Sequence, residues 1–149
     1  MARRVYFDTC ALNRPFDDQG QARIRIEAEA VEHLLRAVGE RTLVWVSSDI
    51  VLFEVRKCPD EEQREMLEML CRMATEHVRL TETMGRRARD LRAQGLRDLD
   101  ALHLAAAEQG SCEARVTTDD RFITAVRSIQ PPSSVRVENP VIFELEVFR

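Results

Sequence analysis

Short runs of strand-forming residues alternate with amphipathic helical segments along this chain, and that alternation is the strongest constraint on its fold. The runs VYFD (5–8) and LVWVSS (43–48) are apolar enough to be buried strands. Between them, QARIRIEAEAVEHLLRAV (21–38) repeats apolar residues every three to four positions and precedes Gly39, which predicts a helix that ends there. Strands joined through helices in this way favour a parallel sheet.

The rest of the chain continues the same pattern. We predict further strands at HVRL (77–80), ARVTT (114–118) and VRV (135–137). Further helices are predicted at IVLFEVRK (50–57) with Ser48 or Asp49 as its cap, from about Pro59 to Met73, at MGRRARDLRAQ (84–94) with Thr83 as its cap, at DLDALHLAAAEQ (98–109), at DDRFITAVRS (119–128) and at NPVIFELE (139–146). The sequence therefore predicts one α/β domain, residues 1–149, with a central, mostly parallel sheet and helices on both faces.

The composition limits the kinds of partner. The chain has 149 residues and a formal net charge of −4, which argues against binding nucleic acid by attraction over the whole surface but leaves a local groove open. The start MARRVYF lacks an apolar signal-peptide core, and no 18-residue apolar run follows, so we expect a cytoplasmic protein. The four cysteines form no CxxC pair, and we expect reduced thiols.

Four carboxylates stand beside or within apolar segments. Asp8 ends the first strand, and Asp119 follows the strand predicted at 114–118. Glu54 lies within the apolar segment IVLFEV, and Asp100 opens the apolar helical run ALHLAAA. In parallel α/β sheets ligands bind outside the carboxyl ends of the strands, so Asp8 and Asp119 reach the same edge if their strands are neighbours.

Each acid alone has a structural explanation, such as a turn cap, a helix N-terminus or a surface ion pair. Together they suggest a site, because converging carboxylates repel one another and raise each other's pKa unless a cation neutralises them. Oxygen ligands of this kind suit Mg²⁺ or Mn²⁺. The matching chemistry is hydrolysis of a phosphodiester by an activated water.

Four motifs resemble those of the PIN-domain family of metal-dependent ribonucleases, which includes the VapC-type toxin nucleases. They are FDTCALNRP, SSDIVLFEV, DLDALHLAAA and VTTDDRF, and the resemblance covers essentially the whole chain. The family's acids fall on Asp8, Glu54, Asp100 and Asp119. The resemblance implies that these four form a Mg²⁺ or Mn²⁺ site that cleaves RNA phosphodiester bonds, in single-stranded or loop RNA.

Several neighbours are weaker candidates for the same site. Thr117 occupies a position where this family commonly has a hydroxyl, which could support Asp119 or a metal-bound water. Thr9 and Asn13 flank the first acid and could contact a metal's water shell or a phosphate, or only shape a turn.

Two further acids compete with the family positions. Asp98 stands two residues before Asp100, a spacing that points the two side chains in different directions on a helix, and Asp120 adjoins Asp119. We therefore treat Asp98 and Asp120 as outer contributors. His103 follows Asp100 by three residues, and we expect it to pack, because the family pattern has no histidine there.

The resemblance also implies partners: an RNA substrate, a cognate antitoxin protein that covers the acidic groove or inserts an Arg or Lys, and a second copy of the chain. Leu67, Leu70 and Met73 offer apolar surface for such a homodimer, although core packing explains them equally. A non-catalytic RNA- or partner-binding module is the alternative from another class. A haloacid-dehalogenase-type phosphatase would need an aspartate where Cys10 stands, and a receiver domain would need a late lysine, whereas Lys57 is the single lysine.

Overall fold

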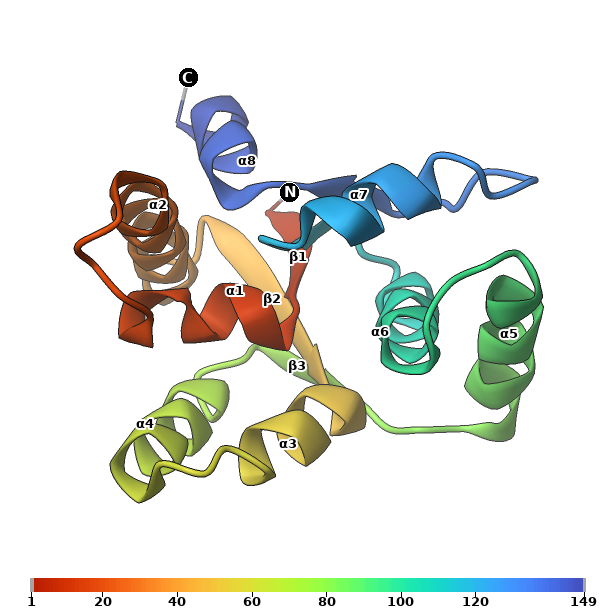
Figure 1. The fold of residues 1–149 in the computed structure, drawn as a ribbon, viewed down its shortest axis with the longest axis horizontal. Coiled ribbons are helices and arrows are strands. Elements are labelled where there is room, and N and C mark those ends of the chain that lie inside the picture. Colours follow the sequence, from red (N-terminus) through yellow and green to blue (C-terminus); the bar gives the residue numbers. More distant parts are fainter. Residues whose placement is uncertain (1, 149) are drawn as a thin grey trace.

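The computed structural model describes residues 2–148, so Met1 and Arg149 of the predicted domain lie outside the described part. Strands and helices alternate along one α/β domain (Figure 1). The strands are β1 (Arg3–Phe7), β2 (Leu43–Ser48), β3 (Glu76–Val78), β4 (Ala114–Val116) and β5 (Arg136–Glu138). The helices are α1 (Thr9–Asn13), the 3₁₀ turn η1 (Arg14–Phe16), α2 (Ala22–Gly39), α3 (Asp49–Arg56), α4 (Glu61–Cys71), α5 (Glu82–Ala93), α6 (Asp98–Gln109), α7 (Asp120–Val126) and α8 (Pro140–Val147).

All five strands are parallel and lie in the order β3-β2-β1-β4-β5. Val5 on β1 pairs with Trp45 on β2 and with Ala114 on β4. The chain builds outward from β1 through β2 and β3, then returns to the other side of β1 with β4 and β5. The strand order therefore reverses between β1 and β4, which is where ligands bind in sheets of this type. Asp8 and Asp119 follow these two strands.

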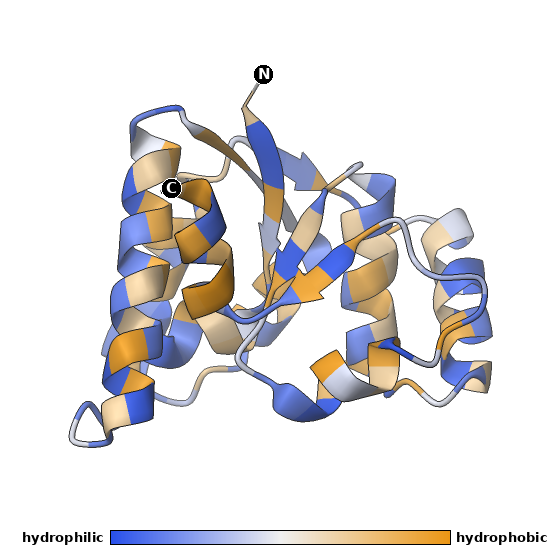
Figure 2. Ribbon diagram, turned by 90° about the horizontal axis from the view of Figure 1, so that it is seen from above, coloured by the Kyte–Doolittle hydropathy of each residue, from blue (hydrophilic) through white to orange (hydrophobic). Residues whose placement is uncertain are grey.

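Helices cover both faces of the sheet, as the alternation predicts. In Figure 1, α2 and α8 lie on one side of the strands and α5 and α6 on the other, and each pair packs together. Figure 2 shows the strands between these two layers, with hydrophilic and hydrophobic residues alternating along α2. That helix turns Val31 and Leu34 into the core, while Arg25 and Glu29 are exposed.

Local hydrogen bonds explain where the helices begin. The Ser48 hydroxyl accepts from the Val51 backbone N–H and caps α3, which confirms one of the two predicted caps. The cap of α5 is Thr81 rather than Thr83, because the Thr81 hydroxyl accepts from the N–H of Met84, a buried residue. Helices α1 and η1 were not predicted. Each spans only one turn, too short to show helical periodicity in the sequence.

The core of the sheet is aromatic as well as aliphatic. Tyr6, Phe7 and Trp45 are fully buried, and the Phe7 and Trp45 rings meet edge to face with centroids 5.6 Å apart. All four cysteines are free thiols. Among residues 2–148, none of the helices combines the length and the apolar character needed to cross a bilayer.

Candidate active site

The four predicted acids line one cavity of about 160 Å³. They come from four separate places in the fold. Asp8 follows β1, Glu54 lies on α3, Asp100 is in the first turn of α6, and Asp119 precedes α7. The remaining lining residues are Thr9, Cys10, Leu99, His103 and Arg115. Because β1 and β4 are neighbours, the cavity lies at the point where the strand order reverses.

A buried ion pair holds Asp8 in place. Asp8 is 3% exposed and caps α1 by accepting from the Ala11 backbone N–H. The Arg115 side chain, on β4, donates from Nε and Nη2 to Asp8 Oδ2 over 3.2 and 3.0 Å. Burial is the largest single effect and raises the pKa of Asp8, but the charge of Arg115, together with His103 and the hydrogen bonds from Cys10 and Thr117, holds that pKa below its ordinary value.

The same guanidinium reaches Asp100. Arg115 Nη1 donates to the Asp100 backbone carbonyl over 2.9 Å, and Nη2 lies 3.3 Å from Asp100 Oδ1. The pKa of Asp100 is raised, first by burial and then by repulsion from Asp119 and Asp8, although Arg115 acts in the opposite direction. The three aspartates therefore act on one another through their charge, which is the convergence that the sequence predicts.

Two side chains hold Glu54. The Thr9 hydroxyl donates to Glu54 Oε1 over 2.7 Å, and His103 Nε2 bonds to the same oxygen. Burial alone would raise the pKa of Glu54, but the bonds from His103 and Thr9 hold it below its ordinary value. On the other side of the ring, His103 Nδ1 lies 2.6 Å from the buried Tyr6 hydroxyl oxygen and hydrogen-bonds to it. Glu54 is thereby connected through His103 to Tyr6 of β1.

The surroundings of Asp119 are mostly backbone. Its Oδ1 accepts from the backbone N–H groups of Arg121 and Phe122, which caps α7. The hydroxyl of Thr117 accepts from the Asp119 backbone N–H over 3.1 Å. Thr117 thus lies where it can support Asp119 through the main chain.

The Cys10 thiol connects Asp8 with the segment that precedes Asp119. Its Sγ donates to Asp8 Oδ1 over 2.9 Å and lies 3.2 Å from the Thr117 hydroxyl oxygen. Burial raises the pKa of this thiol to about 12, so at neutral pH it is protonated and can serve as a donor.

The other supporting candidates lie away from the cavity. Asp98 pairs with Arg92 over 2.7 Å at the surface, and Asp120 pairs with Arg23 over 2.8 Å. Asn13 does not line the acidic cavity and instead faces a neighbouring pocket. Of the five supporting candidates, only Thr9 lines the cavity itself, and Thr117 lies behind it.

The family model of the PIN domain matches residues 5–127. The chain belongs to the PIN domain family. No curated protein matches the sequence significantly. Membership of the family sets aside the dehalogenase-type phosphatase.

Solved structures of low sequence identity share the PIN fold. VapBC2 from Rickettsia felis, bound to a DNA fragment from their promoter, is 15% identical over 91% of this chain and 98% of that chain, with a TM-score of 0.57. VapC20 of Mycobacterium tuberculosis, a sarcin-ricin loop cleaving toxin, is 17% identical over 81% of this chain and 94% of that chain, with a TM-score of 0.58. PAE2754 from Pyrobaculum aerophilum is 14% identical over 99% of this chain and 98% of that chain, with a TM-score of 0.55.

The carboxylates of this PIN domain suit a divalent cation, but in this arrangement they are bonded to other side chains of the cavity. Carboxylate oxygens are the ligands that Mg²⁺ and Mn²⁺ prefer. Within the described residues, however, no three His, Cys, Asp or Glu side chains are arranged so that they could hold a metal ion. The reason is visible in the pairing, since Arg115 bridges Asp8 and Asp100 while His103 bonds to Glu54.

Four residues that line the PIN cavity were not among the predicted site residues: Cys10, Leu99, His103 and Arg115. Arg115 is 1% exposed in the middle of the buried run ARV, so a charge in an apolar strand was the available signal, the same signal that singles out Glu54. His103 is 2% exposed, and the sequence predicts that it packs. It does pack, but it also lines the cavity and bonds to Glu54.

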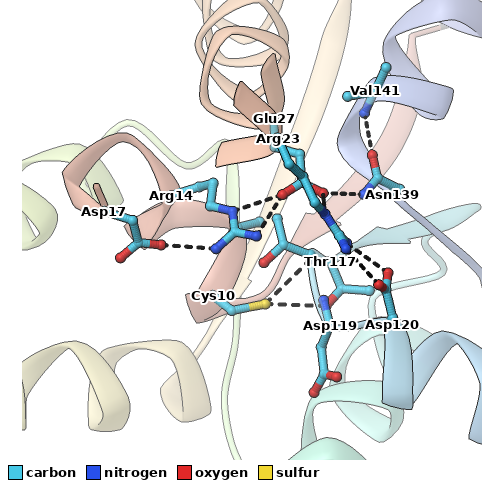
Figure 3. A network of polar contacts seen from close by, with 12 residues as sticks. Cys10, Arg14, Asp17, Arg23, Glu27, Thr117, Asp119, Asp120, Asn139 and Val141 are labelled. Carbon is cyan, nitrogen blue, oxygen red and sulfur yellow. Dashed lines mark hydrogen bonds and ion pairs between the residues drawn. The ribbon is translucent and has the colours of Figure 1, made fainter. Parts of the chain in front are cut away.

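A second polar network supports the rim of the site (Figure 3). The carboxylate of Glu27, on α2 and 2% exposed, accepts from Arg14 on η1, from Arg23 and from Asn139, the cap of α8. Arg23 continues to Asp120 at the start of α7. The network therefore connects the segment after Asp8 with the helix that follows Asp119.

Proposed function

We propose that this PIN domain is a cytoplasmic endoribonuclease that depends on Mg²⁺ or Mn²⁺ and hydrolyses RNA phosphodiester bonds. The observation that carries this proposal is the convergence of Asp8, Glu54, Asp100 and Asp119 on one cavity at the reversal of the strand order. Among residues 2–148, the four acids outnumber the one arginine that lines the cavity, so the site keeps an excess of negative charge that a divalent cation would neutralise.

The proposed roles follow from the position of each acid. Asp8, Asp100, Asp119 and Glu54 would hold the cation. A divalent cation bound there would lower the pKa of an attacking water and stabilise charge on the phosphate. Glu54 and His103 form a hydrogen-bonded pair at the cavity wall, where the pair could accept a proton from that water. Thr9 fixes the orientation of Glu54.

A path for the RNA strand adjoins the acidic cavity. A pocket of about 440 Å³ shares Cys10 and Glu54 with it and is lined by two cations, Arg14 and Lys57, and by two further acids, Asp17 and Asp60. Arg14 is paired with Glu27 and Asp17, which leaves Lys57 as the cation that can face a phosphate. Cations beside an acidic cavity can attract the phosphates that flank the scissile bond. The overall negative charge of the chain is consistent with such a local groove rather than with a basic surface.

We further propose that the chain is the toxin component of a toxin–antitoxin pair. The structural neighbour VapC20 is a toxin, and an apolar groove of about 650 Å³ adjoins the acidic cavity through Leu99, which lines both. Phe53 and Leu80 in this groove are 49% and 55% exposed. An antitoxin segment packed there would lie beside the acids and could block them.

We also propose a homodimer, but its surface differs from the one that the sequence suggests. Leu67 is fully buried in the core and is not available to a partner. Met66, Met69 and Met73 are 52%, 65% and 54% exposed, and they fall on one side of α4 and its end. Their spacing makes them the apolar surface that α4 offers to a second copy.

The nuclease proposal is tested with matched pairs of acids. Purified protein is incubated with a mixed pool of structured RNAs in Mn²⁺, in Mg²⁺ and in EDTA. Asp100→Asn and Asp119→Asn should abolish cleavage, whereas Asp98→Asn and Asp120→Asn should retain it, because those two acids pair with arginines outside the cavity. Circular dichroism checks that all four variants fold.

The outcomes separate the two classes of function. Cleavage that requires the metal and the cavity acids establishes the ribonuclease. RNA or partner binding without turnover, from folded protein free of an inhibitor, would indicate the non-catalytic binding module instead. Co-purification with the product of a neighbouring reading frame that encodes a small DNA-binding protein would support the toxin assignment, and the absence of such a frame would favour a stand-alone RNA-processing nuclease.

A further inference from the structure

Arg115 is the side chain of the cavity that the proposed function leaves unexplained. It lies on β4 opposite Tyr6 of β1, in the middle of the sheet, and is 1% exposed. The Phe122 ring covers one face of its guanidinium, with the central carbon 3.8 Å from the ring centroid. A side chain fixed in this way cannot swing out to solvent without rearrangement of the site.

The oxygens of Asp8 are fully used in this arrangement. Oδ1 accepts from the Ala11 backbone N–H and from the Cys10 thiol, and Oδ2 accepts twice from Arg115. A carboxylate has about four lone-pair positions, so these four bonds occupy them. A divalent cation that takes Asp8 as a ligand must therefore displace at least one of these donors.

Arg115 holds the second aspartate as well. Its Nη2 bridges Asp8 Oδ2 and Asp100 Oδ1, and its Nη1 bonds to the Asp100 carbonyl at the start of α6. One guanidinium thus offsets part of the negative charge of two converging carboxylates, which is the task that the sequence assigns to a metal ion.

We propose that Arg115 is a built-in cation of this site, which holds Asp8 and Asp100 together in the metal-free protein and competes with a divalent cation for their oxygens. This inference rests on the proposed metal dependence. It predicts that the fold does not need the metal and that this PIN domain binds its metal more weakly than the acids alone would. The metal concentration, rather than the RNA alone, would then control activity.

The test is Mn²⁺ binding to the RNA-free protein, measured by titration calorimetry for wild type, Arg115→Met and Arg115→Lys at pH 8. Arg115→Met removes the competing charge, and we expect it to bind Mn²⁺ about tenfold more tightly, because a single charge a few ångströms from a divalent ion opposes it by at least that factor. Arg115→Lys keeps the charge and should bind Mn²⁺ as weakly as wild type. Arg3→Met, at a surface ion pair with Glu113, is the control and should not change Mn²⁺ affinity.

Thermal melts of the same proteins add a readout that is independent of cleavage. Metal-free Arg115→Met should melt well below wild type, since Asp8 and Asp100 then repel without a partner, and Mn²⁺ should raise its melting temperature more than it raises that of wild type. Mn²⁺ affinity that is unchanged or weaker in a folded Arg115→Met would show that Arg115 is only structural, while the nuclease proposal would stand on its own assay. Absence of Mn²⁺ binding to both proteins would overturn the metal dependence together with this inference.

A measurement on the wild type covers the case in which Arg115→Met does not fold. The Nε–H of Arg115, buried and bonded to Asp8, should give a slowly exchanging arginine signal in ¹⁵N NMR spectra of the metal-free protein. We expect saturation with Mg²⁺ to shift that signal and to speed its exchange. A signal that Mg²⁺ binding leaves unmoved would refute the competition.

Discussion

Replacement of Glu27 by glutamine should destabilise the protein by about 3 kcal/mol, the lower end of the cost of breaking a buried ion pair. Glu27 Oε1 accepts from Arg14 Nε and Nη2 over 2.8 and 2.6 Å, and Oε2 accepts from Arg23 Nε over 3.3 Å and from Asn139 Nδ2 over 2.5 Å. All four contacts are made by donors (Figure 3). A glutamine amide has one oxygen, so its NH₂ group must face donors whichever way it turns.

The residues that surround position 27 cannot accept a hydrogen bond from the introduced NH₂ group without losing bonds of their own. If the oxygen of the introduced glutamine keeps the bonds from Arg14, its NH₂ faces Arg23 and Asn139. Asn139 could turn its own oxygen toward position 27, but that oxygen accepts from the Val141 backbone N–H over 2.8 Å and caps α8. Loss of the cap would itself cost about 1 kcal/mol. The guanidinium of Arg14, 18% exposed, would also lose the more buried of its two carboxylate partners and keep only Asp17.

Urea and thermal unfolding measure the effect. For a chain of this size a loss of about 3 kcal/mol lowers the melting temperature by about 6–12 °C. Glu29→Gln, on the same helix but exposed, is the matched control and should change the free energy of unfolding by less than about 0.5 kcal/mol. Equal effects of the two substitutions, or a Glu27→Gln loss below about 1 kcal/mol, would refute the argument from unsatisfied donors.

Two other predictions concern packing and thiol chemistry. A Cβ at Gly110 would lie 2.7 Å from Val46 Cγ1, so Gly110→Ala should cost about 1–3 kcal/mol in urea unfolding. Gly85→Ala, where a Cβ meets nothing within 4 Å inside α5, should instead stabilise by about 0.5–1 kcal/mol, and the opposite ranking would contradict the packing. Burial raises the pKa of the Cys10, Cys71 and Cys112 thiols to about 12, 11 and 12, so iodoacetamide at pH 8 should modify these three slowly in the folded protein and rapidly in urea, as mass spectrometry of the labelled peptides can show.

The sequence predicted the fold well, because hydrophobic periodicity reports burial directly. The segments that became β2, α3 and α6 have near-complete runs of apolar residues or a strong cap, and their bounds agree closely with the structure. The segment after Asp8 was harder. Helix α1 depends on one hydrogen bond from the Ala11 N–H to the Asp8 side chain, and a sequence does not reveal whether such an aspartate caps a helix or only a turn.

The candidate site was predictable in part for a related physical reason. Acids in apolar surroundings stand out one residue at a time, and the carboxyl ends of adjacent strands bring them together. The cations that pair with them depend on register instead. Arg115 reaches Asp8 because β4 pairs with β1 with Arg115 opposite Tyr6, and no local pattern in ARVTT specifies that pairing. His103 is similar, since its role depends on the approach of α3 to α6.

The distribution of internal partners implies an order in which the acids become available to an incoming cation. The Asp8 carboxylate accepts four hydrogen bonds. One oxygen of Glu54 bonds to both Thr9 and His103, and one oxygen of Asp100 accepts from Arg115. Among residues 2–148, no bond is found to Asp119 Oδ2, and Asp119 is partly exposed.

A cation would therefore meet Asp119 and the free oxygen of Asp100 first and reach Asp8 only by displacing one of its four donors. The four acids are consequently not equivalent probes of the site. Loss of the Asp119 carboxylate removes a proposed ligand that the fold does not use beyond its helix cap, whereas Asp8→Asn also takes the negative charge from a buried arginine and so destabilises the protein as well as the site. A loss of activity in Asp8→Asn alone would thus not distinguish chemistry from folding, while the same loss in a stably folded Asp119→Asn would.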